Sequence, residues 1–214
     1  EGHTVAMLWP GQMGFVNQKV AIQKHENGQL SGQDILSFEV INPLPVSFDE
    51  GIADIAAFTK NVEAEAYKRL LDSFQPDVIH VHTLMGLHKS FLEAAKDEKI
   101  RLVFTAHDFF PICPKVTMFR HGTVCDNAQD CENCGVCNAT ALSLNKIRIL
   151  QFPLYRVLKD SPIVKKLRKH HRDSYLSETT INDLTNAVGS ADDYKKLRNY
   201  YYSLLQLMDM IHYN

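Results

Sequence analysis

The sequence lacks long hydrophobic runs and any excess of positive charge. Its longest apolar stretches, such as residues 77–81 and 102–106, are far shorter than the roughly 20 residues that cross a bilayer. The formal net charge is −2 and the sequence pI is about 6.6, so the chain has no basic excess for binding a phosphate backbone. We therefore expect neither a membrane-spanning helix nor a nucleic-acid partner.

The sequence also lacks internal repeats, low-complexity segments and a secretory signal. Its first residues contain no basic region and no small-residue cleavage site, so a trimmed, cytoplasmic chain is expected rather than a secreted one. With 45% hydrophobic and 22% charged residues among 214, the composition is that of a globular chain with a sizeable core. We expect a single domain over residues 1–214.

Strand and helix patterns alternate in the first hundred residues. Short apolar runs predict strands at 3–9, 35–41, 77–82 and 101–105, and apolar residues at helical spacing predict helices at 54–74 and 87–95. Apolar strands that are joined by crossover helices form parallel sheets buried on both faces. The sequence thus predicts an α/β fold, doubly wound, with a mostly parallel sheet and helices on both faces.

A long excursion interrupts this pattern at about residues 109–190. It carries all five cysteines and helical patterns at 141–158 and 163–175. A helix at 192–207 and a last strand at 208–214 follow it.

Two predicted strands end in polar residues. His80 and His82 alternate with Val81 and so point to one face, and Thr83 follows them; the next strand ends at Thr105, and His107 and Asp108 come after it. Ligands bind at the carboxyl ends of parallel strands, so His107 is expected in a cleft. A metal ion at His80 and His82 would lack a third ligand at a diagnostic spacing. A structural role for His80 in the sheet stays open.

The cysteines are concentrated between residues 113 and 137. Cys131, Cys134 and Cys137 form two overlapping C-x-x-C steps, and Cys125 or Cys113 could supply a fourth ligand. Thiolates at such spacing can surround a structural zinc ion. We predict a zinc site at Cys125, Cys131, Cys134 and Cys137, with disulfides or free thiols as alternatives.

A basic amphipathic stretch covers residues 156–172. It includes Lys165, Lys166, Arg168 and Lys169, and apolar residues lie between its charges. Such a stretch favours contact with an anionic membrane surface. A solvated helix face over the core is the alternative.

Four motifs in order resemble the N-terminal half of glycosyltransferases of family 4 with the GT-B fold. They are residues 2–5, 76–82, 104–114 and 209–214. The resemblance implies two Rossmann-like domains with the active site between them. It implies that this chain is the acceptor-side domain, without the usual first strand and glycine-rich loop and without the C-terminal domain that binds most of the nucleotide-sugar donor.

The resemblance also implies a function. It predicts a retaining, hexosyltransferase-like enzyme of cell-envelope or exopolysaccharide glycan synthesis, with a sugar or lipid-linked sugar acceptor. We expect it in the cytoplasm, at the inner face of the plasma membrane where it meets lipid. The fragment alone is expected to be inactive.

The site that the resemblance implies is centred on His107. This residue would contact hydroxyls of the transferred sugar, with Asp108 fixing its tautomer and His82, Thr83 and Thr105 binding substrate. Two other classes remain open: a metal-dependent hydrolase that uses His80 with this set, and a non-catalytic module that binds a membrane or a partner.

Overall fold

The computed structural model describes residues 2–30, 33–48, 50–120, 123–125, 131–162, 164–166, 169 and 187–213. The strands are β1 (Val5–Pro10), β2 (Ala21–Leu30), β3 (Gln33–Ile41), β4 (Val78–Val81), β5 (Arg101–Ala106), β6 (Phe119–Arg120), β7 (Thr123–Val124) and β8 (Met210–Tyr213). The helices are α1 (Ile55–Phe58), α2 (Glu65–Phe74), α3 (Lys89–Asp97), α4 (Cys134–Cys137), α5 (Leu144–Leu150), α6 (Pro153–Leu158) and α8 (Ala191–Leu205). None of the helices so described is long and apolar enough to cross a membrane.

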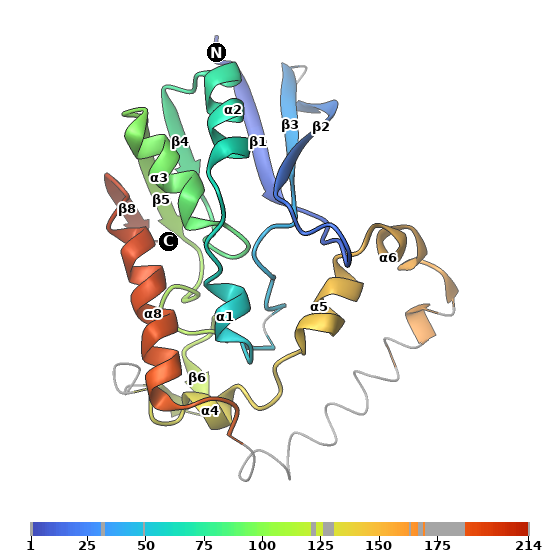
Figure 1. The fold of residues 1–214 in the computed structure, drawn as a ribbon, viewed down its shortest axis with the longest axis vertical. Coiled ribbons are helices and arrows are strands. Elements are labelled where there is room, and N and C mark those ends of the chain that lie inside the picture. The colour runs from blue at the N-terminus through green and yellow to red at the C-terminus, as the bar shows by residue number, and fades with distance from the viewer. Residues whose placement is uncertain are drawn as a thin grey trace.

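Two three-stranded sheets form the centre of the fold, in the orders β1-β3-β2 and β4-β5-β8. The pairs β1–β3, β4–β5 and β5–β8 are parallel, and only β2 runs antiparallel to its neighbour β3. Figure 1 shows β4, β5 and β8 on one side and β1, β3 and β2 on the other, with α2 and α3 in front. The predicted α/β fold with a mostly parallel sheet is confirmed.

Some details of the predicted elements differ. The helical pattern at 141–158 forms two helices, α5 and α6, and most of the pattern at 163–175 lies outside the described residues. The helix expected over 54–74 is two helices, because α1 ends at Phe58, whose carbonyl accepts a hydrogen bond from the Tyr201 hydroxyl at 3.4 Å. Strand β2 was not predicted, since its sequence is mostly polar and has no apolar run, and Gln23, Lys24 and Glu26 are exposed. In such a strand the neighbouring backbone, not an apolar pattern, determines the pairing.

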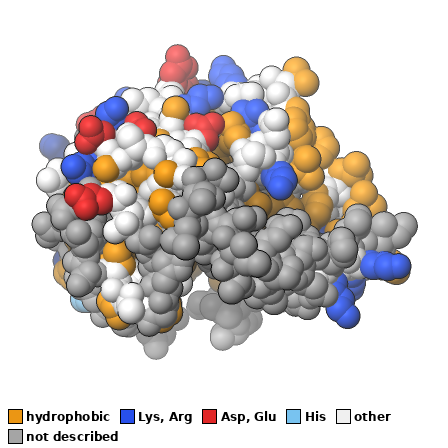
Figure 2. All heavy atoms as spheres, turned by 90° about the horizontal axis from the view of Figure 1, so that it is seen from below, with side chains coloured by type: hydrophobic (Ala, Val, Ile, Leu, Met, Phe, Trp, Pro, Cys, Tyr) orange, Lys and Arg blue, Asp and Glu red, His pale blue; other side chains and the backbone are white. Residues whose placement is uncertain are grey.

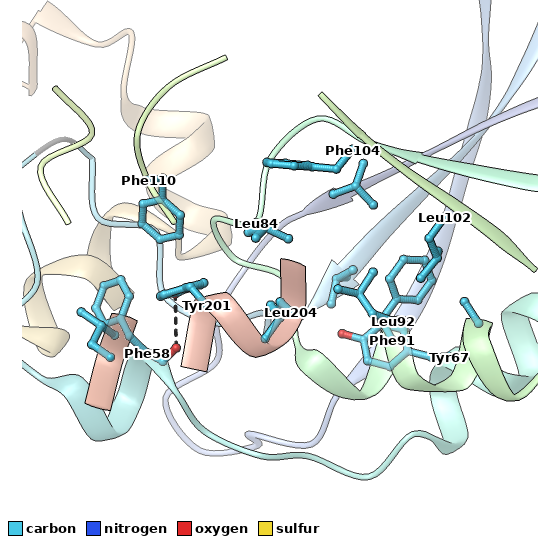
Figure 3. Packing of buried hydrophobic residues seen from close by; sticks show 14 of the residues in the cluster. Phe58, Tyr67, Leu84, Phe91, Leu92, Leu102, Phe104, Phe110, Tyr201 and Leu204 are labelled. Carbon is cyan, nitrogen blue, oxygen red and sulfur yellow. Dashed lines mark hydrogen bonds between the residues drawn. The ribbon is translucent and has the colours of Figure 1, made fainter. Parts of the chain in front are cut away.

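The core packs the helices against the β4-β5-β8 sheet. Helix α8 turns one face inward through Tyr194, Leu197, Tyr201 and Leu204, which are all at most 2% exposed, and a Ser190–Asp193 capping box begins it. Figure 3 shows Leu204 and Tyr201 packed near Phe58, Leu84 and Phe110, with Leu92 and Leu102 farther along. Burial of this stripe, worth about 1.5–3 kcal/mol per large side chain, holds the C-terminal segment on the sheet.

A buried histidine connects α2 to the start of α3. His88 is 2% exposed, and its Nδ1 lies 2.7 Å from the Tyr67 hydroxyl. Burial, followed by the nearby Lys60 ammonium, lowers the pKa of His88 from its usual 6.5 to about 4. Folding therefore keeps this imidazole neutral over a pH range in which the unfolded chain binds a proton.

We predict that the free energy of unfolding falls as the pH drops from about 6.5 to about 4. The unfolded His88 takes up a proton that the folded residue excludes, and a shift of this size corresponds to about 3 kcal/mol. Urea unfolding followed by circular dichroism at pH 7, 5.5 and 4.5 measures this. The free energy of unfolding should change less steeply with pH in His88→Gln. An identical pH dependence in the variant would show that His88 is not the group responsible.

Candidate active site

The candidate site lies where β4 and β5 end. The two strands are parallel neighbours, with Val81 opposite Phe104, so their carboxyl ends meet at one edge of the sheet. His82 and His107 follow these ends directly, and both are exposed. Sequence reasoning placed each at a strand end, and the strand pairing brings them together.

Three imidazole rings form a continuous stack across the two strand ends. His82 Nδ1 lies 3.0 Å from His107 Nε2, and the two rings are stacked with centroids 5.3 Å apart. The His80 ring lies 4.0 Å from the His82 ring, and its Nε2 is 2.8 Å from the Thr105 hydroxyl. The stack holds the His107 ring from one side.

The stack favours neutral imidazoles. Burial, then His80 and then His107, lowers the pKa of His82. A hydrogen bond between two ring nitrogens also requires a lone pair on one of them. With Nε2 of His107 engaged by His82, Nδ1 of His107 is the nitrogen that remains to meet a ligand.

The other predicted site residues differ in their surroundings. The Asp108 carboxylate accepts a hydrogen bond from the Phe110 amide at 2.9 Å, and the Thr83 hydroxyl accepts one from the Met85 amide at 3.0 Å. Thr105 is 9% exposed. The ring nitrogen partner of His107 is therefore His82. The substrate contacts assigned to His82, Thr83 and Thr105, and the tautomer-fixing role assigned to Asp108, stay predictions.

Cys131, Cys137 and Cys113 lie around Cys134, and none of the five cysteines forms a disulfide. The Cys134 amide donates to the Cys131 carbonyl at 3.0 Å. Burial, then the thiols of Cys131, Cys137 and Cys113, raises the pKa of Cys134 to about 12. Cys113 is thus a neighbour of this thiol, whereas Cys125 does not act on its pKa.

In the part of the chain that the structure describes, no group of three or more His, Cys, Asp or Glu side chains is placed to hold a metal ion. The zinc site at Cys125, Cys131, Cys134 and Cys137 stays a prediction. The same holds for a metal at the histidine stack, so the hydrolase alternative gains no support here.

The predicted membrane-contact lysines are only partly described. Lys165, Lys166 and Lys169 are exposed, and Arg168 lies outside the described residues. Exposed apolar side chains precede them on α5 and α6, namely Ile149, Leu154, Val157 and Leu158. Figure 2 shows hydrophobic side chains gathered on the right of the lower face, with basic side chains at its far edge.

Sequence reasoning missed a cavity at the carboxyl ends of β1 and β3. Asn42, Lys60, His88 and Arg148 are among the residues that line it. They come from four separate segments, and no motif in the sequence connects them. One signal could have drawn attention to them. Lys60 lies within the helical pattern at 54–74, and Arg148 lies within the pattern at 141–158.

Comparison with protein families gives one match. The family model described as Glycosyltransferase Family 4 matches residues 2–126, which is more than half of the chain. No curated protein matches the chain, and no solved structure does.

We predict that His107→Ala raises the pKa of His82 toward its usual 6.5. The substitution removes one like charge and exposes the His82 ring, although His80 remains beside it. Titration of the ring C–H signals by NMR measures the shift.

His3→Ala is the matched control, because His3 is an exposed histidine outside the histidine stack and should leave the His82 titration in place. A His82 pKa that stays the same or falls in His107→Ala would show that the two rings do not interact in solution.

Proposed function

The chain belongs to glycosyltransferase family 4, and from this we propose that it is the acceptor-side half of a retaining, nucleotide-sugar-dependent glycosyltransferase. The family and the Rossmann-like α/β fold predicted from the sequence are confirmed by the match to residues 2–126. The donor, the acceptor and the reaction of the whole enzyme are part of the proposal.

The observation that carries the proposal is the position of His107. Its exposed imidazole stands at the end of β5, held by His82 at 3.0 Å. An imidazole can donate to or accept from a sugar hydroxyl, so this side chain would orient the transferred sugar in the cleft. His80 and Thr105 lie behind His82 and would keep the contact geometry in place.

We propose that the enzyme has two further parts: a C-terminal domain that binds most of the nucleotide sugar, and a first strand with a glycine-rich loop. Two observations support the strand. Among the described strands, β1 pairs only with β3, and β4 only with β5. At Gly86, after β4, an added Cβ would lie 2.5 Å from Pro10 Cβ at the end of β1, so the two sheets approach each other at their carboxyl ends.

A peripheral membrane contact and a lipid-linked acceptor complete the proposal. The exposed apolar side chains of α5 and α6 would enter the interface, and the lysines after them would meet anionic lipid. This arrangement would bring the cleft to the inner face of the plasma membrane, where cell-envelope and exopolysaccharide glycans are assembled on lipid carriers.

We predict that His107→Ala in the full-length enzyme lowers kcat for sugar transfer by about 10²-fold or more, because an aligned polar contact at the sugar is lost. His82→Ala should reduce kcat less, since it acts through His107. Release of nucleoside diphosphate with and without acceptor measures both.

His3→Ala is expected to retain the parent rate, and residues 1–214 alone should show no transfer. If the full-length protein released no nucleotide from any common nucleotide sugar, or His107→Ala matched the parent, the proposed reaction would be wrong.

We also propose a structural zinc ion in the cysteine stretch, with Cys113, Cys131, Cys134 and Cys137 as its ligands. No three of these side chains are placed to hold a metal ion in the described structure, so the support is the double C-x-x-C spacing and the effect of Cys131, Cys137 and Cys113 on the pKa of Cys134. Cys131 and Cys134 also share a cavity with Ile112 and Pro114, the neighbours of Cys113. Four thiolates at one ion are a frequent structural zinc site.

The expected metal content is about one zinc ion per chain by elemental analysis. Cys113→Ser should lose the metal, and Cys125→Ser, the matched control, should keep it. A parent protein without metal, or loss only in Cys125→Ser, would refute this ligand set.

A further inference from the structure

The cavity beside β1 and β3 opens at the same end of the fold as the histidine stack. Its lining comes from the segments that follow both strands, from α1 and α5, and from His88 at the start of α3. The space between its atoms, including its open mouth, is about 410 Å³. In α/β sheets small-ligand sites lie at the carboxyl ends of the strands, and this cavity lies at the carboxyl ends of β1 and β3.

Two amide side chains hold the walls of this cavity in place. The Asn42 amide donates to the carbonyls of Asn17 and Lys19 at 3.0 and 2.8 Å, and its oxygen accepts from the Gly14 amide at 2.7 Å. Gln151, at the end of α5, donates to the Gly11 carbonyl at 3.0 Å and accepts from the Val46 amide at 3.1 Å. The segments after β1 and β3 are therefore tied to each other and to α5.

The lining carries positive charge without a balancing carboxylate. Lys60 and Arg148 line the cavity, and no Asp or Glu does. Neither cation forms an ion pair with a described side chain, and the buried Nε of Arg148 has no hydrogen-bond partner there. Cations that no carboxylate balances can donate charged hydrogen bonds to an anionic ligand.

His88 adds a further donor to this lining. Burial raises the pKa of the Tyr67 hydroxyl well above its usual range, so this group keeps its proton and donates to His88 Nδ1 at 2.7 Å. The remaining hydrogen of the neutral imidazole is then on Nε2. Lys60, Arg148 and His88 thus all present donors.

We propose that this cavity binds the phosphate or diphosphate group of the acceptor substrate. Lys60 and Arg148 would neutralise the anion, and the guanidinium of Arg148 would donate charged hydrogen bonds to its oxygens. The inference rests on the proposed function, in which this half of the enzyme holds the acceptor. The exposed apolar side chains of α5 and α6 continue from Arg148 along the chain, so a lipid-linked phosphate would have an apolar surface beside its charged group.

Binding of inorganic phosphate, pyrophosphate and glucose 1-phosphate to the full-length protein without donor tests the cavity. Isothermal titration calorimetry should show affinity that falls at least about tenfold in Lys60→Gln and in Arg148→Gln, the loss expected for one charged hydrogen bond. Lys146→Gln is the matched control, because Lys146 is an exposed cation on the same helix that does not line the cavity.

Absence of binding by all three anions, or an equal loss in Lys146→Gln, would overturn the proposal. Lys60 is exposed, so Lys60→Gln tests the cavity even if Arg148→Gln fails to fold.

Sedimentation with vesicles separates the two sources of the phosphate. The protein is compared on vesicles with a polyprenyl phosphate and on vesicles of equal charge made with phosphatidylglycerol. If it prefers the former, and Arg148→Gln loses this preference, the acceptor is lipid-linked. Equal sedimentation with both, together with binding of glucose 1-phosphate, assigns a soluble sugar phosphate. If neither preference nor sugar phosphate binding occurs, the cavity does not serve the acceptor.

Transfer assays separate this proposal from the function on which it rests. Arg148→Gln should raise the acceptor KM and leave kcat nearly unchanged, whereas His107→Ala should keep phosphate binding and lose kcat. Phosphate binding in a protein that transfers no sugar would overturn the proposed function and leave the anion site in place.

Discussion

The parallel pairing of β4 with β5 determines where the candidate catalytic side chains lie. With Val81 opposite Phe104, both strands end at one edge, and His82 and His107 come within 3.0 Å of each other. A shift of one residue in this register would turn every side chain of β4 to the opposite face. The β8 strand pairs with the other edge of β5, so the pairing of β5 is protected on both sides.

Helix α8 keeps this arrangement in place from a distance in sequence. Two of its buried tyrosines donate hydrogen bonds to carbonyls on either side of α1. Tyr194 donates to Ile52, before the helix, at 2.8 Å, and Tyr201 donates to Phe58, at its end. Just after it, the Asp209 carboxylate accepts from Lys96 at 2.6 Å and from the Leu102 amide at 2.7 Å. The long excursion thus returns to the sheet through contacts that also end α1.

Charge is distributed unevenly at the carboxyl end of the sheets. Burial, then His80 and His107, lowers the pKa of His82, while the cavity nearby has two cations and no lining carboxylate. Sugar hydroxyls call for neutral donors and acceptors, and phosphate calls for cations. The two adjacent regions therefore suit the two substrates of the proposed reaction, with the transferred sugar at His107 and the acceptor phosphate in the cavity.

The sequence by itself determined the strand and helix alternation, the parallel sheet and the positions of His82 and His107 at strand ends, because apolar runs and their polar ends are local signals. Only the tertiary structure decided that α1 ends at Phe58, whose carbonyl accepts a hydrogen bond from the Tyr201 hydroxyl of α8. It also decided that Cys113, rather than Cys125, raises the pKa of Cys134. It alone brought Lys60 and Arg148 to one cavity, because contacts between distant segments depend on packing and leave no periodic trace in the chain.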